Sequence, residues 1–239
     1  MSVPSDSGFV ATRWSVVSRA GGPGDSEARA ALAWLVERYW EPLRLAARRW
    51  GCDQPGAEDA VQDFCCRLVE RRLELGAVVP ERGRFRAWLL VVFRNFLRDR
   101  VQRDGAAKRG GGATMVDAAL ADPPAPETAD PCFDRDWALA LLDRAETRLA
   151  GEHAGPPERL RFAQLKPFLT VNGTGAAYAA AGIALGLGEG AVKVAVHRLR
   201  HRLRELARLE VAETLSEPTP RAIDDELQAL AEALTARIR

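Results

Sequence analysis

The stretch from Tyr178 to Leu209, YAAAGIALGLGEGAVKVAVHRLRHRLRELARL, sets the narrowest limits on what this chain can fold into. Its first eight residues predict a short helix, and the glycines at 186, 188 and 190 predict a tight turn. A second helix follows, in which apolar residues recur at steps of three and four and so share one buried face: Val192, Val196, Leu199, Leu203 and Leu206. The pattern predicts a helix-turn-helix.

Basic residues follow the same steps on another face of the second helix: Lys193, His197, Arg200, Arg204 and Arg208. Such a face is usually only a solvated surface. The preceding turn favours DNA binding, because a helix-turn-helix places its second helix in the major groove. His197 and His201 also have the spacing of a two-histidine metal site, but the helix has no HExxH glutamate and no nearby cysteine, so we expect no metal.

The charges of the chain are unevenly distributed. The 239 residues are 47% hydrophobic and carry a net charge of only +1, which fits a globular chain of two small domains. The segment 84–109 contains eight basic residues against two aspartates, whereas 53–63 contains four acidic residues and no basic one. The segment 210–232 is acidic again. Because local fields govern docking, this distribution predicts one positively charged partner and one polyanion.

The cysteines and the apolar runs predict a cytoplasmic protein. Cys52, Cys65, Cys66 and Cys132 form no CxxC pair, so we expect reduced thiols. The start of the chain lacks a basic segment followed by an apolar run, and no stretch has eighteen consecutive apolar residues. We therefore expect neither export nor a membrane span.

The coarse helix pattern predicts an all-α fold of two helical modules. We expect helices over 13–20, from 26 through 45 with an interruption at Pro42, over 57–75 and over 84–103, then over 137–149, 160–169 and 224–238. Glycines and prolines between the modules predict a flexible linker. The expected domains are 1–103, the linker 104–134, a helix-turn-helix module 135–211 and an acidic helical extension 212–239.

The segment AEDAVQDF, 57–64, carries a second signal. Helical periodicity turns Val61, Phe64, Cys65 and Leu68 inward and leaves an acidic outer face of Asp59, Gln62 and Asp63. Nothing in the sequence indicates a pocket that would separate the pKa values of two catalytic carboxylates, so we do not expect acid–base chemistry. A protein-docking face and a solvated helix face both remain open for these residues alone.

A third segment, GRFRAWLLVVFRNFLRDRVQR, interleaves aromatic residues with arginines from Gly83 onward. Phe93 and Phe96 are expected mostly in a core. Aromatic residues beside arginines are also what binds single-stranded DNA, because bases stack on rings while guanidinium groups contact phosphates. The preceding loop, Pro80 to Arg84, is a candidate to receive an unstacked base.

Together these three segments resemble a bacterial RNA polymerase sigma factor of the extracytoplasmic-function (ECF) class of the sigma-70 family, over most of residues 30 to 209. The resemblance implies a region two that binds the polymerase clamp helices and recognises and melts the −10 promoter element. It implies a region four whose helix-turn-helix reads the −35 element and contacts the polymerase flap. Such a protein is not an enzyme and needs no cofactor; core RNA polymerase and promoter DNA are its partners, and an anti-sigma protein is a candidate partner.

The resemblance also implies site residues. The core-polymerase set is Asp59, Gln62 and Asp63, and the −10 set is Arg82, Arg84, Phe85, Trp88, Arg94, Asn95 and Arg98. The −35 set is Glu189, Gly190, Ala191, Lys193, Val194, His197, Arg198 and Arg200. Ala191 and Val194 depart from the family, which usually has serine or threonine and a bulkier polar residue there. The departures favour apolar or shape readout over hydrogen bonding.

Two other classes of protein compete with this interpretation. The first alternative is a stand-alone helix-turn-helix transcriptional regulator whose N-terminal helical module senses a signal or dimerises. A nuclease using Asp59 and Asp63 is weaker, because no third metal ligand stands at helical spacing. In the extension, an apolar pattern of Leu227, Leu230, Ala231 and Leu234 predicts a helix that either packs on region four or lays its acidic residues over the basic recognition helix.

Overall fold

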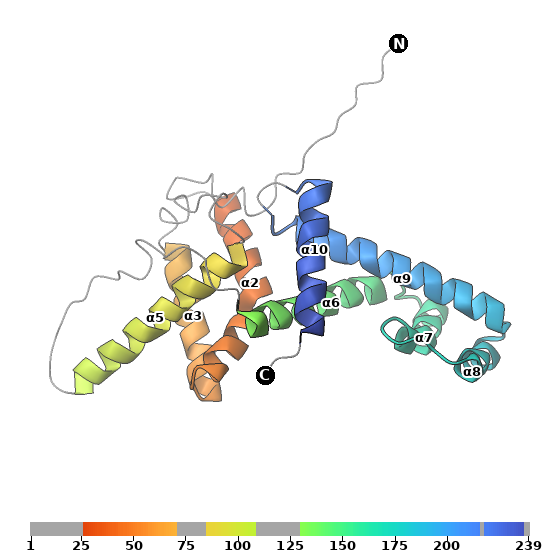
Figure 1. Cartoon of the computed structure of the whole chain (residues 1–239), viewed down its shortest axis with the longest axis horizontal. Coiled ribbons are helices and arrows are strands. Elements are labelled where there is room, and N and C mark those ends of the chain that lie inside the picture. The colour runs from red at the N-terminus through yellow and green to blue at the C-terminus, as the bar shows by residue number, and fades with distance from the viewer. Residues whose placement is uncertain (1–25, 71–84, 109–129, 216–217, 237–239) are drawn as a thin grey trace, which may run out of the picture. The chain divides into compact units, whose positions relative to one another are not determined.

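The computed structural model describes residues 26–70, 85–108, 130–215 and 218–236. Within these residues the fold is all-α, as the sequence predicted, with eight α-helices, one short 3-10 helix and no strand (Figure 1). The helices are α2 (Ser26–Arg49), α3 (Gln54–Glu70), α5 (Phe85–Lys108), α6 (Pro131–Gly151), α7 (Pro156–Leu165), η2 (Lys166–Phe168), α8 (Gly175–Leu185), α9 (Glu189–Ala212) and α10 (Pro220–Thr235).

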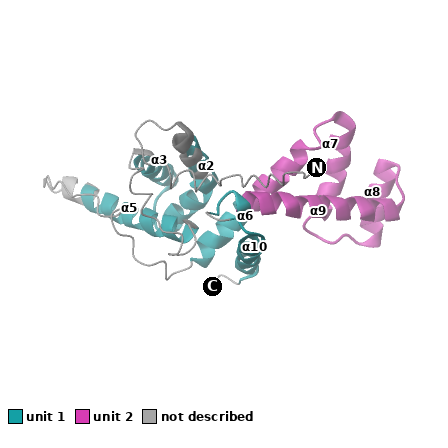
Figure 2. Cartoon of the chain, turned by 90° about the horizontal axis from the view of Figure 1, so that it is seen from above, with its two compact units in different colours: residues 1–140, 212–239 teal, residues 141–211 magenta. Residues whose placement is uncertain are grey.

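The chain forms two compact units (Figure 2). Unit 1 consists of residues 1–140 and 212–239, and unit 2 of residues 141–211. One border falls within α6 and the other at the end of α9, so unit 2 is an insertion in the sequence of unit 1. In the structure, residues 135–140 and 212–239 group with unit 1 by their contacts. The functional division predicted from the sequence, with 135–211 as one module and 212–239 as an extension, stays a prediction.

The core of unit 1 is aromatic. Helices α2, α3 and α5 pack together around Phe64, whose ring centroid lies 4.9 Å from that of Phe93 and 5.5 Å from that of Phe96. The first turns of α6 join the same core, because Trp137 is buried and stacks on Tyr39 at 5.9 Å. The core role predicted for Phe93 and Phe96 is therefore confirmed.

The expected interruption at Pro42 was wrong, because α2 continues through this residue to Arg49. Proline removes one backbone hydrogen bond, but Tyr39, Leu43 and Ala46 beside it are buried, and this packing holds the helix together. Helix α3 begins at Gln54, earlier than expected, because the carboxylate of Asp53 accepts a hydrogen bond from the amide of Gly56 at 2.9 Å. The helix expected over 13–20 and residues 71–75 of the helix expected over 57–75 lie outside the described residues.

The expected linker, 104–134, is helical at both described ends. Helix α5 runs on to Lys108, and α6 begins at Pro131. The start of α6 is well defined because the Asp130 carboxylate accepts hydrogen bonds from the amides of Cys132 and Phe133 at 2.9 and 3.1 Å, and proline is favoured in the first helical turn. Pro131, which the sequence analysis placed in the linker, therefore lies in the first turn of α6.

In unit 2 the end of α6 is followed along the chain by α7, η2, α8 and α9. Helix α8 is capped by Thr174, whose hydroxyl accepts from the amide of Ala177, and it ends at Gly186, which has a φ of 65°. The axes of α8 and α9 are bent by 95° across the intervening turn. Among the three glycines that the sequence assigned to the turn, only Gly186 adopts a left-handed conformation.

Gly182, which the sequence did not single out, is also needed at the turn between α8 and α9. A Cβ atom at this position would lie 2.5 Å from the backbone carbonyl oxygen of Leu187. That carbonyl belongs to the turn itself, and the amide of Leu187 donates to the Gly182 carbonyl at 2.8 Å. The close approach of turn and helix therefore excludes any larger residue without a backbone shift.

Helix α10 begins at Pro220, where the Thr219 hydroxyl caps the helix by accepting from the amide of Ala222 at 3.2 Å. The buried stripe differs from the expected one. It consists of Glu226, Leu230 and Ala233, whereas Ala231 is exposed. The stripe therefore includes Glu226, which the sequence analysis counted only as part of the acidic segment 210–232.

In the part of the chain that the structure describes, no single helix is both long and apolar enough to cross a membrane. Only α8 and α9 taken together meet those criteria of length and composition, as a bent pair.

Candidate nucleic-acid interface

The acidic face predicted on α3 is exposed in the structure. Asp59, Gln62 and Asp63 lie on the solvent side, and the opposite side, formed by Val61, Phe64, Cys65 and Leu68, is buried. Burial raises the pKa of the Cys65 thiol to about 12, with a smaller contribution from the neighbouring Cys66. The helix thus has one apolar face fixed in the core and one anionic face directed outward.

One end of this acidic face already has a cationic neighbour. Nη1 of Arg100, on α5, lies 2.9 Å from the Asp63 carboxylate, whose side chain is 60% exposed. An exposed ion pair of this kind contributes little to stability, so the Asp63 carboxylate can exchange Arg100 for another cation at small cost.

The predicted −10 residues that the structure describes lie along α5. Trp88 and Asn95 are half-buried and seven residues apart, which places them on the same face of the helix. Arg94 and Arg98 are exposed, one turn apart, beside that face. Phe85 is the first residue of α5. Arg82 and Arg84, with the rest of the expected base-capturing loop 80–84, lie outside the described residues.

A pocket of about 790 Å³ opens beside these arginines and includes a residue that the sequence did not predict. Arg94 and Arg98 form one wall, and the ring of Trp50, at the end of α2, forms another. The Arg94 guanidinium carbon lies 5.6 Å from the centroid of the Trp50 ring, which is itself tilted against Phe93 at 6.1 Å. The pocket therefore combines an aromatic wall with cations, a combination suited to bases and phosphates.

Arg86 behaves unlike the other arginines of this segment. Its side chain is only 3% exposed, and it forms ion pairs with Asp134 of α6 and Glu226 of α10. Its register could have been recognised in the sequence, because Arg86 stands three, four and seven residues before Leu89, Leu90 and Phe93, all of which are buried. Arg86 therefore belongs to the interior of unit 1.

The first turns of α9 present the predicted −35 residues to solvent. Gly190, Ala191, Lys193 and His197 are exposed, and the Val194 side chain is 51% exposed. Lys193 is held by Glu189, whose carboxylate lies 2.7 Å from its Nζ. This hydrogen bond raises the pKa of Lys193, with a smaller coulombic contribution from the same carboxylate. The central part of this surface is thus apolar and uncharged, with cations at its edges.

The guanidinium of Arg200 bonds to η2 and to the loop that follows it, within unit 2. Nε donates to the Phe168 carbonyl at 2.9 Å, Nη2 to the Val171 carbonyl at 3.0 Å and Nη1 to the Asn172 side-chain oxygen at 2.9 Å. These bonds fix the loop between η2 and α8. A contact from Arg200 to DNA would therefore have to share donors that are already used.

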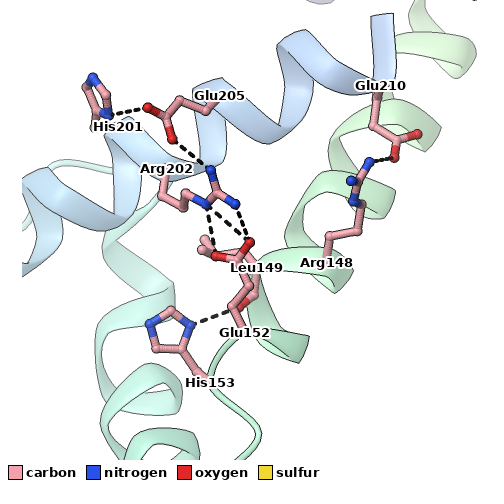
Figure 3. Close-up of polar contacts among 8 residues, drawn as sticks. All are labelled: Arg148, Leu149, Glu152, His153, His201, Arg202, Glu205 and Glu210. Atoms are coloured by element: carbon pink, nitrogen blue, oxygen red, sulfur yellow. Dashed lines mark hydrogen bonds and ion pairs between the residues drawn. The ribbon is translucent and has the colours of Figure 1, made fainter. Parts of the chain in front are cut away.

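A polar network joins α9 to α6 within unit 2 (Figure 3). Arg202 forms a forked pair with Glu152, with Nη2 and Nε at 2.6 and 2.9 Å from its carboxylate oxygens. The hydrogen bonds from Arg202 lower the pKa of Glu152. Further along α9, the Glu210 carboxylate is only 1% exposed and accepts from Arg144 at 3.0 Å and Arg148 at 2.8 Å. This network positions α9 on the second half of α6 within unit 2.

A second groove, of about 550 Å³, lies between α7 and the start of α9. Four residues of the predicted −35 set line it, Gly190, Ala191, Val194 and Arg198, together with Phe162 and Arg161 of α7. Lys193 and His197 of the same set are not among the residues that line this groove.

Residues 35–107 match the Sigma-70 region 2 family, which covers the acidic face on α3 and all of the predicted −10 residues. The match supports a sigma-70 family sigma factor, a non-enzymatic transcription initiation factor whose region 2 implies binding to core RNA polymerase. It covers less than a third of the 239 residues and ends before α6. No match was found among curated proteins or among solved structures.

Proposed function

We propose that this chain is a sigma factor of the ECF class that binds core RNA polymerase, recognises −35 and −10 promoter elements and melts the DNA. The observation that carries the proposal is the coincidence of the Sigma-70 region 2 match with an exposed acidic helix face and an arginine-rich, aromatic helix beside it. The match favours this function over a stand-alone helix-turn-helix regulator, which has no use for both surfaces.

The acidic face of α3 is the proposed contact with the polymerase clamp helices. Asp59, Gln62 and Asp63 are exposed together on one side of a helix whose other side is fixed in the core. Opposite charges across an interface steer encounter and select the partner. In the free chain Arg100 faces the Asp63 carboxylate. When core polymerase binds, cationic side chains of the polymerase replace Arg100 at this carboxylate.

Helix α5 is the proposed surface for the melted −10 strand. Trp88 and Asn95 share one face, and the neighbouring Arg94 and Arg98 supply charge for phosphates. Separating a base from its stack costs a few kcal/mol, which stacking on aromatic rings offsets at about 1–3 kcal/mol per base. The Trp50 ring in the adjoining pocket provides a further stacking surface.

Unit 2 is the proposed −35 module, with α8 and α9 as its helix-turn-helix. The 95° bend and the short turn at Gly186 agree with the geometry of such a motif. Ala191 and Val194 stand at the solvent-facing start of α9, so they contact thymine methyl groups or read groove shape, while Lys193, His197 and Arg198 reach polar atoms at the edges. Glu189, Gly190 and Arg200 complete the proposed set.

The remaining parts of the assignment are also proposals. The functional division is into region two at 1–103, a linker at 104–134, region four at 135–211 and an extension at 212–239. Region four additionally contacts the polymerase flap, the protein works in the cytoplasm, and an anti-sigma protein is a candidate regulator.

A binding experiment with core polymerase tests the function. Asp59→Lys and Asp63→Lys, singly and together, should abolish binding to core polymerase and leave thermal stability nearly unchanged, because exposed substitutions rarely shift folding by more than about 0.5 kcal/mol. Asp143→Lys makes the same charge change at an exposed position on α6, outside the family match, and serves as the control. Full core affinity in the folded double variant would refute the assignment of this face.

A further inference from the structure

The pocket of about 790 Å³ beside α5 lies entirely within unit 1, between the end of α2, the turn into α3 and the second half of α5. Sites that hold a small organic group usually have volumes of about 300–1,000 Å³, so this pocket has room for one. We refer to it as the Trp50 pocket. The residues that its ligand would contact come from two places: Trp50 and Asp53 from the turn between α2 and α3, and three arginines from α5, Arg94, Arg98 and Arg100.

The aromatic wall of the Trp50 pocket is fixed by the backbone and by the core. The Trp50 amide donates to the Ala46 carbonyl at 3.0 Å, and Gly51, with a φ of 97°, turns the chain directly after the ring. On the core side the ring is tilted against Phe93, which is fully buried, at 6.1 Å. The ring therefore has one side supported by the core, and it borders the pocket.

The Arg94 guanidinium stands over the Trp50 ring without closing on it. Its carbon lies 5.6 Å from the ring centroid, whereas two flat groups in direct contact are about 3.5 Å apart. A base stacked between them needs about 7 Å from ring to guanidinium, which requires an outward shift of Arg94 by about 1.5 Å. Arg94 is exposed, so its side chain can make this movement. The base would then stack on the ring and have a cation on its other face.

The charges around the pocket give a bound group a direction. Arg98 is exposed, and Arg100 is paired at 2.9 Å with Asp63, a 60% exposed carboxylate that it can leave at small cost. Both arginines come from α5 and suit phosphates. The Asp53 carboxylate comes from the turn into α3, where its Oδ1 accepts from the Gly56 amide at 2.9 Å. This carboxylate repels phosphates and accepts hydrogen bonds from amino groups on the edge of a base.

We propose that the Trp50 pocket binds one unstacked base of single-stranded DNA between Trp50 and Arg94. The phosphates beside that base lie against Arg98 and Arg100. This site rests on the proposed function, which places Arg94 and Arg98 at the −10 strand, and it adds a second place for a base besides the loop 80–84. An acidic protein segment fits less well, because its carboxylates have no flat face for the ring and Asp53 repels them.

Binding of a single strand to the full chain tests the pocket. The probe is a fluorescein-labelled oligodeoxyadenylate of about ten nucleotides, followed by fluorescence anisotropy, because stacking tolerates any sequence. Trp50→Ala should weaken binding about tenfold or more, which is the loss expected for one stacked base. Trp50→Phe retains a ring and should bind within about threefold of the unaltered chain. The control is Trp40→Ala, which truncates another half-buried tryptophan of α2 that does not line the pocket.

A strand that carries abasic sites separates the base from the phosphates. The unaltered chain should prefer the strand with bases by about tenfold or more, and Trp50→Ala should reduce this preference by about tenfold. Arg98→Ala should weaken both strands alike and lower the salt dependence, because it removes a phosphate contact. If Trp50→Ala lowers the unfolding temperature, the exposed Arg94→Ala removes the other face of the stack and should reduce the preference in its place. Equal binding of both strands by the unaltered chain would overturn the proposal.

A free nucleotide offers the same chemistry, a base joined to a phosphate, and competition separates the two sources. AMP at the concentration of the labelled strand should not displace it, because AMP lacks the neighbouring phosphates. Displacement by AMP, lost in Trp50→Ala, would overturn the assignment to a DNA strand and make a free nucleotide the ligand.

The same variants separate failure of the pocket from failure of the proposed function. In the complex with core polymerase, Trp50→Ala should reduce the permanganate reactivity of the melted promoter, and Trp50→Phe should restore it. Normal melting by folded Trp50→Ala, or failure of the unaltered chain to bind the single strand both alone and with core polymerase, would overturn the pocket. Failure of the unaltered chain to bind core polymerase would instead refute the proposed function, and the oligonucleotide measurements would still decide the pocket.

Discussion

Replacement of Glu210 by glutamine should destabilise unit 2 far more than its position in an acidic stretch of sequence suggests. The carboxylate is 1% exposed and accepts hydrogen bonds from two arginines of α6, Arg144 at 3.0 Å and Arg148 at 2.8 Å. Glutamine retains the volume and one acceptor oxygen but loses the charge that both guanidinium groups face. The substitution therefore tests the electrostatic part of the contact between α6 and α9.

The expected loss is about 3 kcal/mol. Hydrogen bonds to charged groups contribute roughly 1.5–3 kcal/mol each, and removing one partner of a buried ion pair costs about 3–5 kcal/mol. The lower end applies to Glu210→Gln because the Arg148 side chain is 41% exposed and regains water when it loses its partner. The control is Glu152→Gln, which breaks the exposed pair with Arg202 and should cost about 1 kcal/mol or less.

Tryptophan fluorescence cannot follow this loss, because all six tryptophans lie outside residues 141–211. Hydrogen exchange of amides in α6 and α9 reports on unit 2 directly, and 1.4 kcal/mol corresponds to tenfold in the opening equilibrium. We expect exchange in Glu210→Gln to rise by about a hundredfold under conditions in which Glu152→Gln rises by tenfold at most. Equal effects in the two variants would refute the assignment of Glu210 as a buried ionic contact.

Three further predictions concern the two proposed DNA-reading surfaces, the turn between α8 and α9, and the pH dependence of unit 2. Trp88→Ala should leave closed promoter complexes that do not become reactive to permanganate, whereas His197→Ala should weaken protection of the upstream element and leave melting intact; equal loss of upstream protection in both would contradict the division of labour. Gly182→Ala should lower the unfolding temperature of unit 2 by several degrees, because the new Cβ would lie 2.5 Å from the carbonyl oxygen of Leu187. Gly188→Ala should leave this temperature unchanged, because no atom lies within 4 Å of the new Cβ. Because its pKa is lowered in the folded state, Glu152 contributes stability above its unfolded pKa that is lost as the pH falls through the folded value; acid titration of Glu152→Gln should lack this step, which is at most about 1 kcal/mol for so exposed a pair.

Helical periodicity predicted the secondary structure because the stripes in α3 and α9 are regular. Residues at steps of three and four, such as Phe64 and Leu68 or Val192 and Val196, are buried as expected. The same rule failed where polar residues occupy a buried stripe. Arg86, Glu210 and Glu226 look like surface residues by type, and a reading of composition treated them as parts of basic or acidic segments.

Long-range pairing is the reason that these three residues escaped prediction. Carboxylates from α6 and α10 compensate the buried charge of Arg86, and two arginines of α6 compensate that of Glu210. Periodicity indicates which face of a helix is buried but not which distant helix covers it. Trp50 was missed for a related reason, since its place in the pocket depends on the packing of the end of α2 against α5. The proposed site residues themselves came from the family resemblance and remain predictions.

The insertion of unit 2 within unit 1 also affects the order in which the chain folds during synthesis. Unit 2 is continuous in sequence, so all of its contacts become available as soon as residue 211 leaves the ribosome. The core of unit 1 precedes unit 2 in the chain, but unit 1 is completed only by α10, because Glu226 is made long after Arg86. At about 5–20 residues per second the delay is on the order of 10–30 s. Nascent chains therefore pass through a stage in which unit 2 is complete and unit 1 still lacks α10.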